Sequence, residues 1–266
     1  MPQLPPIPVV QPFPWESLLA YLSLRAIPEV ERIHDGTYQR RLERGSVVVS
    51  FDPRRSQLVL SAEGWIDVET VRRNVSALFD VGFDSSDVAE RLGRSRLLVA
   101  RMRKVPGMRP LGAWSAFELC VRTILGQQVT VAAAGTLMRR WVQRCRTITP
   151  RAVLAAELSQ IGMPNKRVEA IRAFALAVQE RRVRFDRPWS EVNAMLAQLP
   201  GFGPWTREYL AIRLGRQPDA FPATDLGLIR AANVASPAEL LKLAERWRPY
   251  RAYAATYLWA VARPTR

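Results

Sequence analysis

The chain has 266 residues, enough to bury one large core or two smaller ones. Its 48% hydrophobic and 24% charged residues are typical of a folded globular protein and argue against a disordered chain. Lysine and arginine outnumber aspartate and glutamate by 39 to 24, giving a net charge of +15. This charge favours a polyanionic partner such as nucleic acid, although a generally basic proteome would raise it too.

The cysteine and histidine content excludes several kinds of site. Cys120 and Cys145 fall within helical patterns and His34 is the only histidine, so neither a disulfide framework nor a zinc or iron–sulfur site is expected. No apolar run is long enough to span a membrane, and the N-terminus lacks the basic-then-apolar order of a signal peptide. We therefore expect a cytoplasmic protein (nucleoid-associated if bacterial) without a membrane partner, a metal or a cofactor.

The first hundred residues predict an α+β unit. A proline-rich start leads into a helical pattern that begins at Trp15. Alternating apolar residues predict strands near 47–51 and 57–62, and a helix follows with Asp67 placed to cap it. We expect a small antiparallel sheet with helices over residues 1–107, ending at a Pro-Gly break.

The remainder, residues 108–266, predicts an all-helical bundle with short loops. Ser236 and Glu239 form a capping box, with a proline at the first helical position between them. The expected helices cover residues 114–126, 130–142, 151–158, 165–180, 190–198, 204–214, 225–233, 237–247 and 249–262.

A glycine-rich hairpin lies between two of these helices, over residues 199–206. Gly201 and Gly203 are expected to let the backbone turn tightly and to bring its N–H groups to the surface. The next helix starts there, so its free N–H groups and positive dipole end suit an anion such as a DNA phosphate. A plain helix–turn–helix connector would need the same residue types, and the hairpin alone does not separate the two interpretations.

The segment LPGFGPWTREYLAIR resembles the hairpin of the helix-hairpin-helix DNA glycosylase superfamily. In that superfamily a catalytic aspartate follows at a set interval, and Asp225 stands 20 residues after Trp205. Three further stretches narrow the resemblance to the 3-methyladenine DNA glycosylase II family: Phe13–Trp15, Arg122–Val129 and Ala244–Tyr253. The resemblance spans nearly the whole chain. It implies a monomer that excises alkylated bases from double-stranded DNA in base excision repair.

The resemblance gives Asp225 the catalytic role. From the residues alone, Asp225 would sooner be assigned as the N-cap of the following amphipathic helix. The two roles are compatible, because a helix N-terminus stabilises a negative charge. An ionised carboxylate can stabilise an oxocarbenium-like sugar and orient the attacking water.

The residue at position 205 indicates which reaction follows. In superfamily members that also cut the strand, the matching hairpin residue is a lysine that forms a Schiff base with the sugar. Here it is Trp205, so the resemblance implies a monofunctional glycosylase that leaves an abasic site. Lys166 is the other lysine in the middle of the helical region, and we expect it to be solvated or to face phosphate.

Four aromatic residues are implied to line the pocket for the flipped base: Trp205, Tyr209, Trp259 and Tyr21. Trp205 and Tyr209 are four apart on one helix and share a face. Such a pocket would attract a cationic alkylated base through cation–π contact. Core packing is the alternative for each residue taken singly. Family members carry phenylalanine where this chain has Tyr21, so the added hydroxyl is a departure.

The resemblance also assigns residues to DNA binding. These are Gln127, Gln128, Gly201, Gly203 and Thr206. In the family a side chain from the turn at Gln127 and Gln128 fills the hole left by the flipped base. Alternatively, both glutamines simply begin the helix capped near Thr130. Whether an alkali cation binds to the carbonyl oxygens of the hairpin is left open by the sequence.

Three other functions remain as alternatives. A non-catalytic DNA-binding module would need neither the acid at 225 nor the aromatic residues. A strand-cleaving glycosylase for oxidised or other damaged bases is disfavoured by Trp205 and by the lack of an iron–sulfur cysteine set. An RNA-binding protein would be recognised by comparing matched RNA and DNA duplexes.

Overall fold

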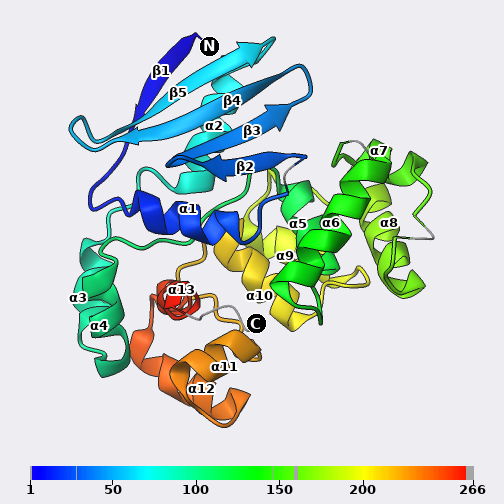
Figure 1. Cartoon of the computed structure of the whole chain (residues 1–266). Helices are drawn as coiled ribbons and strands as arrows, with labels where there is room; N and C mark the ends of the chain where they lie inside the picture. Colours follow the sequence, from blue (N-terminus) through cyan, green and yellow to red (C-terminus); the bar gives the residue numbers. More distant parts are fainter. Residues whose placement is uncertain (1, 28, 146, 159–160, 262–266) are drawn as a thin grey trace.

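The computed structural model describes residues 2–27, 29–145, 147–158 and 161–261. A five-stranded antiparallel sheet occupies one end of the molecule, and helices make up the rest (Figure 1). The strand order is β1-β5-β4-β3-β2. The strands are β1 (Gln3–Pro8), β2 (Glu31–His34), β3 (Thr37–Leu42), β4 (Gly45–Asp52) and β5 (Gln57–Gly64).

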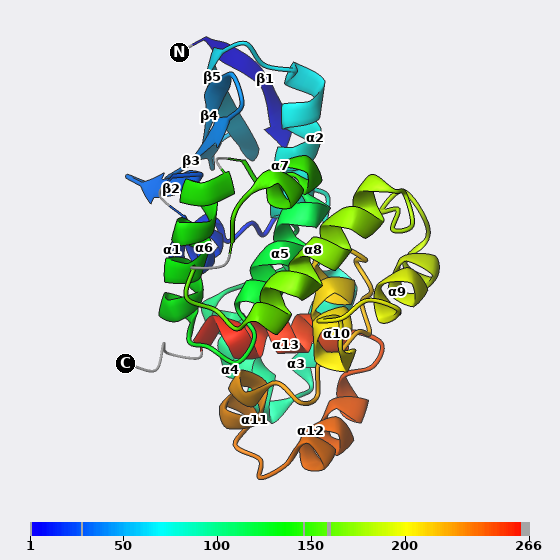
Figure 2. The same ribbon diagram turned by 90° about the vertical axis from the view of Figure 1, so that its right-hand side faces the viewer.

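Alternation in the two central strands creates the apolar face of the sheet. Val49 of β4 is paired with Leu60 of β5, and both side chains are fully buried. This face packs against α2 (Val68–Phe79), which lies beside the sheet in Figure 2. Asp67 caps α2 by accepting a hydrogen bond from the Thr70 N–H at 3.1 Å. The strands expected near 47–51 and 57–62, and the Asp67 cap, are confirmed.

Other N-terminal elements were not predicted. The proline-rich start forms β1 at the edge of the sheet, and its register shifts between Leu4 and Ile7, where two prolines lack the N–H that pairing requires. Strands β2 and β3 are rich in charged residues and carry no clear alternation. Two short helices, α3 (Ser86–Gly93) and α4 (Arg96–Lys104), follow α2, and α4 packs against the last helix.

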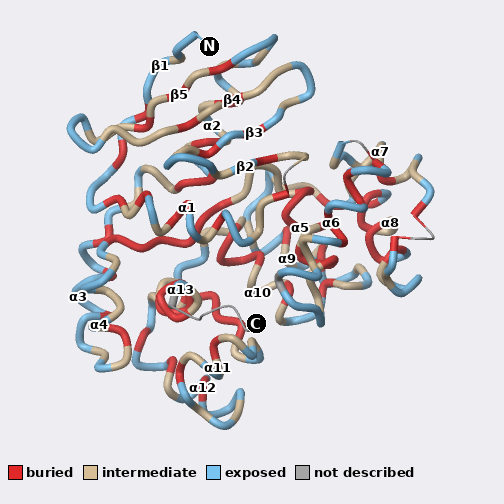
Figure 3. The backbone as a smooth tube through the Cα atoms, in the orientation of Figure 1, coloured by how far each residue is buried: buried red, intermediate tan, exposed pale blue. Residues whose placement is uncertain are grey.

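Helices account for the regular structure after residue 115 in the described part of the chain. The last helix is buried along most of its length (Figure 3). Of the predicted helix 249–262, residue 262 lies outside the described residues. The elements are α5 (Ala116–Leu125), α6 (Val131–Cys145), α7 (Pro150–Ala155), α8 (Asn165–Gln179), α9 (Trp189–Ala197), α10 (Pro204–Arg213), α11 (Leu226–Ala232), α12 (Pro237–Ala244) with a 3-10 turn at Glu245–Trp247, and α13 (Arg251–Val261).

At the start of α12 the predicted cap by Ser236 is confirmed, while the Glu239 side chain bonds one residue before the cap and so completes only a variant of the capping box. The Ser236 hydroxyl accepts from the N–H of Glu239 at 3.2 Å, and the Glu239 carboxylate accepts from the N–H of Ala235 at 3.0 Å. Cys120 and Cys145 are free and buried in α5 and α6, as the helical patterns predicted. Among the described residues, no helix is long and apolar enough to cross a bilayer.

A buried ion cluster joins the sheet to the helices. Arg40 of β3 pairs with Glu31 of β2 and with Glu118 of α5. Arg122 of α5 pairs with both glutamates, at 2.8 Å to Glu31 and 2.6 Å to Glu118. Because each charge has an opposite partner on the other unit, the cluster fixes where the sheet sits on α5. We refer to Glu31, Arg40, Glu118 and Arg122 below as the ion cluster.

Candidate active site

Asp225 is the N-cap of α11, and the structure confirms this part of the prediction. Its Oδ1 accepts from the N–H of Leu228 at 2.9 Å, the capping bond. Oδ1 also accepts from the indole Nε1 of Trp259 at 3.1 Å, and Oδ2 accepts from the indole Nε1 of Trp205 at 3.0 Å. Three N–H donors therefore hold one half-buried carboxylate, and an ionised carboxylate is the form that only accepts.

Gly227 allows this arrangement and was not identified from the sequence. A Cβ at this position would lie 3.0 Å from Oδ1 of Asp225 and 3.8 Å from Cδ1 of Trp259. The sequence feature that could have pointed to it is a glycine inside the first turn of a short helix. Glycine lowers helix stability there, so its presence suggests that another group packs closely against the backbone. The glycine lets Asp225 and Trp259 approach the helix backbone together.

Three aromatic rings form a continuous wall beside Asp225. Trp205 and Tyr209 of α10 stack with ring centroids 5.5 Å apart and planes 6° apart. Trp259 of α13 meets Tyr209 edge-on, with centroids 5.8 Å apart. The predicted shared face of Trp205 and Tyr209 is confirmed, and the two indoles of the wall donate hydrogen bonds to the carboxylate.

Tyr21 of α1 (Trp15–Ser23) completes the set through its hydroxyl. The oxygens of Tyr21 and Tyr209 are 3.4 Å apart, and Nη1 of Arg213 donates to both, at 3.1 Å and 2.5 Å. Sequence reasoning missed Arg213, although it lies one helical turn after Tyr209. The structure thus brings together all four aromatic residues that the sequence singled out.

The two tyrosine hydroxyls differ in acidity. Burial alone would raise the pKa of Tyr21, but the charges of Arg213 and Arg25 and the hydrogen bond with Tyr209 outweigh burial and lower the pKa to about 8. Burial prevails at Tyr209 and raises its pKa to about 12, although Arg213 opposes the shift. The Tyr21 hydroxyl is therefore the more acidic of the pair.

The hairpin before α10 needs only one of its two glycines for its shape. Gly201 has φ +86°, a conformation that side chains rarely adopt, and a Cβ there would lie 3.2 Å from Ala170. Gly203 has φ −64° with open space around the Cβ position. The expectation that Gly203 is needed for a tight turn is therefore wrong. Its exposed position leaves room for a ligand to approach the start of α10.

Gln127 ties the turn before α6 to the hairpin. Its amide nitrogen donates to the carbonyl of Gly201 at 2.7 Å and to the hydroxyl of Thr206 at 2.8 Å. Arg167 of α8 donates to the Gln127 carbonyl at 2.9 Å. Thr206 is 3% exposed, so its side chain supports the interior of the hairpin and leaves any DNA contact to its backbone.

Gln128 is the exposed residue of this turn. It has φ +58°, and α6 begins beyond it, with Thr130 accepting from the N–H of Ala133 at 3.2 Å. The prediction of a cap near Thr130 is confirmed, and both glutamines lie in the turn before the helix rather than in its first turn.

Two hairpin carbonyls already have protein donors. The carbonyl of Gly201 accepts from Gln127, and that of Phe202 accepts from Nε of Arg207 at 3.1 Å. A cationic guanidinium on the second carbonyl makes it a poor ligand for an alkali cation. Within the described residues, no group of three or more His, Cys, Asp or Glu side chains could hold a metal ion.

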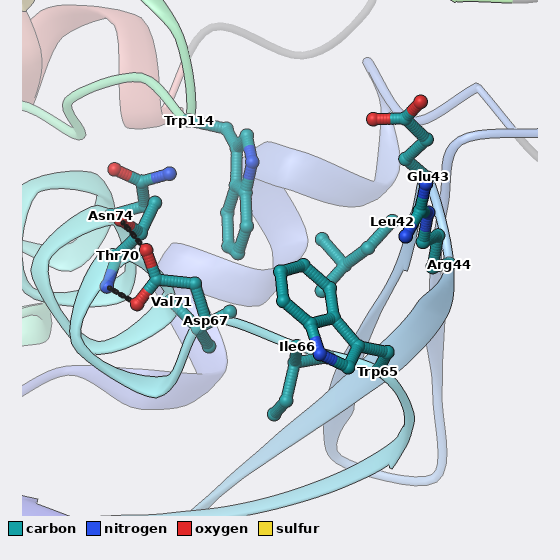
Figure 4. A pocket seen from close by; sticks show the side chains of 10 residues that line it. All are labelled: Leu42, Glu43, Arg44, Trp65, Ile66, Asp67, Thr70, Val71, Asn74 and Trp114. Carbon is teal, nitrogen blue, oxygen red and sulfur yellow. Dashed lines mark hydrogen bonds between the residues drawn. The ribbon is translucent and has the colours of Figure 1, made fainter.

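A cavity of about 580 Å³ lies elsewhere, between the sheet and α2 (Figure 4). Trp65 and Trp114 flank it, and Asp67 is occupied there by its helix cap. None of the predicted site residues lines this cavity, whose lining comes from residues 42–44 and 65–74 and from Trp114.

Comparison with known proteins agrees with the fold and identifies the family. Residues 6–115 match the AlkA N-terminal domain, and residues 121–251 match the HhH-GPD superfamily of base excision DNA repair proteins. The chain is 34% identical to DNA-3-methyladenine glycosylase 2 of Escherichia coli over 271 residues, covering 93% of this chain and 94% of that protein. The chain belongs to the AlkA-type 3-methyladenine DNA glycosylases. The expected family, and the expected sheet followed by a helix-hairpin-helix bundle, are confirmed.

Other relatives and solved structures match this chain over different shares of their own length. The "Probable bifunctional transcriptional activator/DNA repair enzyme AlkA" of Mycobacterium tuberculosis is 33% identical over 276 residues, and the chain spans about half of it, 56%. A 3-methyladenine DNA glycosylase structure from Archaeoglobus fulgidus has the same fold, with a TM-score of 0.80 at 21% identity over 96% of this chain and 97% of that one. A Schizosaccharomyces pombe 3-methyladenine DNA glycosylase, solved with abasic DNA, covers 65% of this chain and 95% of its own at 21% identity, with a TM-score of 0.59.

Proposed function

We propose that this AlkA-type glycosylase flips alkylated bases out of double-stranded DNA and excises them through Asp225. The observation that carries the proposal is the carboxylate fixed by the N–H groups of Trp205, Trp259 and Leu228 beside an aromatic wall. As the glycosidic bond breaks, positive charge develops on the sugar. A carboxylate held in place stabilises that charge without having to reorient, and it can position the attacking water.

The aromatic wall would receive the flipped base. The faces of Trp205 and Tyr209 are electron-rich, and they would attract a purine made cationic by alkylation, by about 0.5–2 kcal/mol. An alkylated purine is also a better leaving group, so modest catalysis suffices. We expect 3-methyladenine and 7-methylguanine to be better substrates than neutral lesions.

We propose that the product is an intact strand with an abasic site. Position 205 holds a tryptophan where strand-cleaving members have a lysine, and Lys166 is exposed in the first turn of α8. Borohydride added during turnover should therefore trap no covalent protein–DNA adduct. A trapped species that disappears in Lys166→Ala would contradict the monofunctional assignment.

For DNA binding we propose that the hairpin backbone around Gly203 holds a phosphate, and that Gln128 fills the gap left by the flipped base. Gly203 is exposed at the N-terminus of α10, where N–H groups and the helix dipole favour an anion. Gln128 is exposed at the end of a turn that Gln127 anchors to the hairpin. The net charge of +15 would add affinity for DNA that does not depend on the DNA sequence. We propose that the protein works in the compartment that contains the DNA.

The decisive experiment compares two aspartates that cap helices. Asp225→Asn keeps the capping bond but loses the negative charge, so single-turnover base release from alkylated DNA should fall at least about a hundredfold. Binding to an abasic-site duplex should stay nearly unchanged. Asp67→Asn makes the same change at the N-cap of α2 and should leave excision unaltered. Near-normal excision by Asp225→Asn would remove this residue from the mechanism.

A further inference from the structure

Arg213 is a buried charge at the back of the aromatic wall. It is 6% exposed, and the titratable groups that face it in the described part of the chain are Tyr209, Tyr21 and Arg122, with no carboxylate among them. Its Nε donates to the carbonyl of Leu111 and its Nη2 to the carbonyl of Gly112 at 2.7 Å. Nη1 is directed to Tyr21 and Tyr209. A buried guanidinium without a carboxylate is costly, so its two phenol partners require an explanation.

The hydrogen bonds limit what the Tyr21 hydroxyl can do. A phenol oxygen has two lone pairs and one hydrogen. Arg213 occupies one lone pair at 3.1 Å, and the Tyr209 hydroxyl, itself an acceptor from Arg213 at 2.5 Å, can donate its hydrogen to the other across 3.4 Å. Either tyrosine hydroxyl can be the donor between the two; when Tyr209 donates, the Tyr21 oxygen has no lone pair left and its remaining polar capacity is to donate one hydrogen.

We propose that Arg213 is a specificity-determining positioning residue, which fixes the Tyr21 hydroxyl as a hydrogen-bond donor to the acceptor edge of a flipped, uncharged purine such as hypoxanthine. The inference rests on the base pocket proposed above. In that pocket the Tyr21 hydroxyl would bind a carbonyl oxygen or a ring nitrogen of the base, and this contact does not depend on positive charge. The glycosylase would then remove neutral lesions by a contact separate from the cation–π attraction of the indoles.

The charges around Tyr21 support the distinction between hydrogen bonding by Tyr21 and cation–π attraction by the indoles. The guanidinium of Arg25 lies 3.8 Å from the centroid of the Tyr21 ring, and that of Arg213 lies 5.5 Å from it. Two guanidinium groups already make cation–π contacts with this ring, so a cationic base would gain little binding energy from a further contact with it. The same two charges and Tyr209 outweigh burial and the opposing charge of Asp225, and lower the pKa of Tyr21 to about 8. At neutral pH the hydroxyl therefore keeps its hydrogen and is a strong donor.

The test compares one neutral and one cationic lesion. Single-turnover rates are measured on duplexes containing hypoxanthine or 7-methylguanine. Tyr21→Phe removes only the hydroxyl, and excision of hypoxanthine should fall about threefold to tenfold, as expected for one lost hydrogen bond, while 7-methylguanine changes less than about twofold. Tyr250→Phe removes a phenolic hydroxyl outside the pocket and should change neither rate. Equal losses on both lesions in Tyr21→Phe, or no loss on either, would overturn the inference.

Asp225→Asn in the same assay separates the two proposals. If it releases neither base while Tyr21→Phe leaves the ratio of rates unchanged, the role of Arg213 and Tyr21 fails and the proposed function stands. If Asp225→Asn still excises both bases, the pocket is misplaced and both proposals fail.

A pH series tests the donor role without altering Arg213. The groups that face the Tyr21 hydroxyl are Arg25, Arg213, Tyr209 and Asp225. As the pH rises from 7 to 9, Tyr21 loses its hydrogen, so the hypoxanthine rate of the parent relative to Tyr21→Phe should fall toward one. Both proteins meet the same DNA, so titration of the lesion cancels. A relative rate that does not change with pH would overturn the donor role.

Arg213→Lys provides an additional variant. A lysine keeps the positive charge but cannot hold Leu111, Gly112 and both phenols at once. We expect the same selective loss on hypoxanthine, provided that thermal unfolding shows a folded variant. If the variant does not fold, Tyr21→Phe and the pH series still decide the matter. A folded Arg213→Lys that loses both lesions equally would make the arginine merely structural.

Discussion

At the residue scale, the position of one carboxylate depends on a missing side chain. Asp225 sits where it does because Gly227 has no Cβ to push Oδ1 away. A methyl group on Gly227 would lie 3.0 Å from Oδ1, closer than most such contacts in proteins, so either the carboxylate or the helix backbone would have to move. Reaction geometry tolerates such movement poorly, because a shift of about 1 Å can cost about a hundredfold in rate.

Gly227→Ala should therefore lower excision about tenfold to a hundredfold while the protein stays folded. Gly135→Ala is the matched control, since a Cβ there meets nothing within 4 Å in α6 and alanine favours a helix. The measurements are single-turnover excision and thermal unfolding of both variants. If Gly227→Ala excises at the parental rate, close packing against Asp225 has no part in the chemistry.

At the scale of elements, the hairpin divides two tasks between its glycines. Gly201 provides the left-handed backbone, and Gly203 provides open space at the start of α10. From the sequence the two appeared equivalent, since residue type alone does not show which φ each adopts. Caps were easier to predict, because Asp67, Asp225 and Ser236 each bond to an N–H three residues away.

Gly201→Val and Gly203→Val should consequently fail in different ways. The first places a branched side chain at φ +86° and against Ala170, and should destabilise the fold by at least about 1–2 kcal/mol. The second replaces the N-cap of α10 and should cost about 1 kcal/mol or less, but it should weaken binding to damaged and undamaged duplexes alike, because backbone N–H groups hold phosphate without reading bases. Denaturant unfolding and binding to the two duplexes would test the pair. A loss confined to damaged DNA in Gly203→Val would argue against phosphate binding at the hairpin.

Long-range partners explain most of what the sequence did not reveal. Arg213 bonds to groups on α1 and at residues 111–112, and no local pattern indicates such a partnership. The strands β2 and β3 were hidden because Glu31 and Arg40 look like surface residues until Glu118 and Arg122 are brought beside them. The aromatic positions and Asp225, in contrast, were found through the resemblance, while their roles stay proposals.

At the scale of the whole molecule, the ion cluster holds the two parts together. Burial would raise the pKa of Glu118, but Arg40 and Arg122 outweigh it and lower the pKa to about 2. Since this is below the value in an unfolded chain, about 4.3, Glu118 stabilises the fold above that pH, and its contribution fades as the pH falls from about 5 toward 2. The boundary after residue 107 stays a prediction.

Glu118→Gln should lower the free energy of unfolding at pH 7 by about 3–5 kcal/mol, because it leaves buried arginine charge without its partner. The difference from the parent should narrow as the pH falls below about 5, because the Glu118 carboxyl of the unfolded parent begins to take up a proton there while that of the folded parent stays ionised. Urea unfolding at several pH values measures this, with Glu90→Gln, which breaks an exposed pair with Arg94, as the control. A difference that is the same at pH 7 and pH 4 would show that the charge of Glu118 is not what stabilises the joint.

The three donors on Asp225 also have a stereochemical consequence. A carboxylate has about four lone-pair positions, and here two on Oδ1 and one on Oδ2 are occupied by N–H groups. One position remains, on Oδ2, so in the proposed mechanism an attacking water molecule can donate a hydrogen bond to the carboxylate only from that side. The direction of attack is then set by the protein and not by the departing base. Lesions of different size and charge should accordingly give a sugar product of one and the same anomeric configuration.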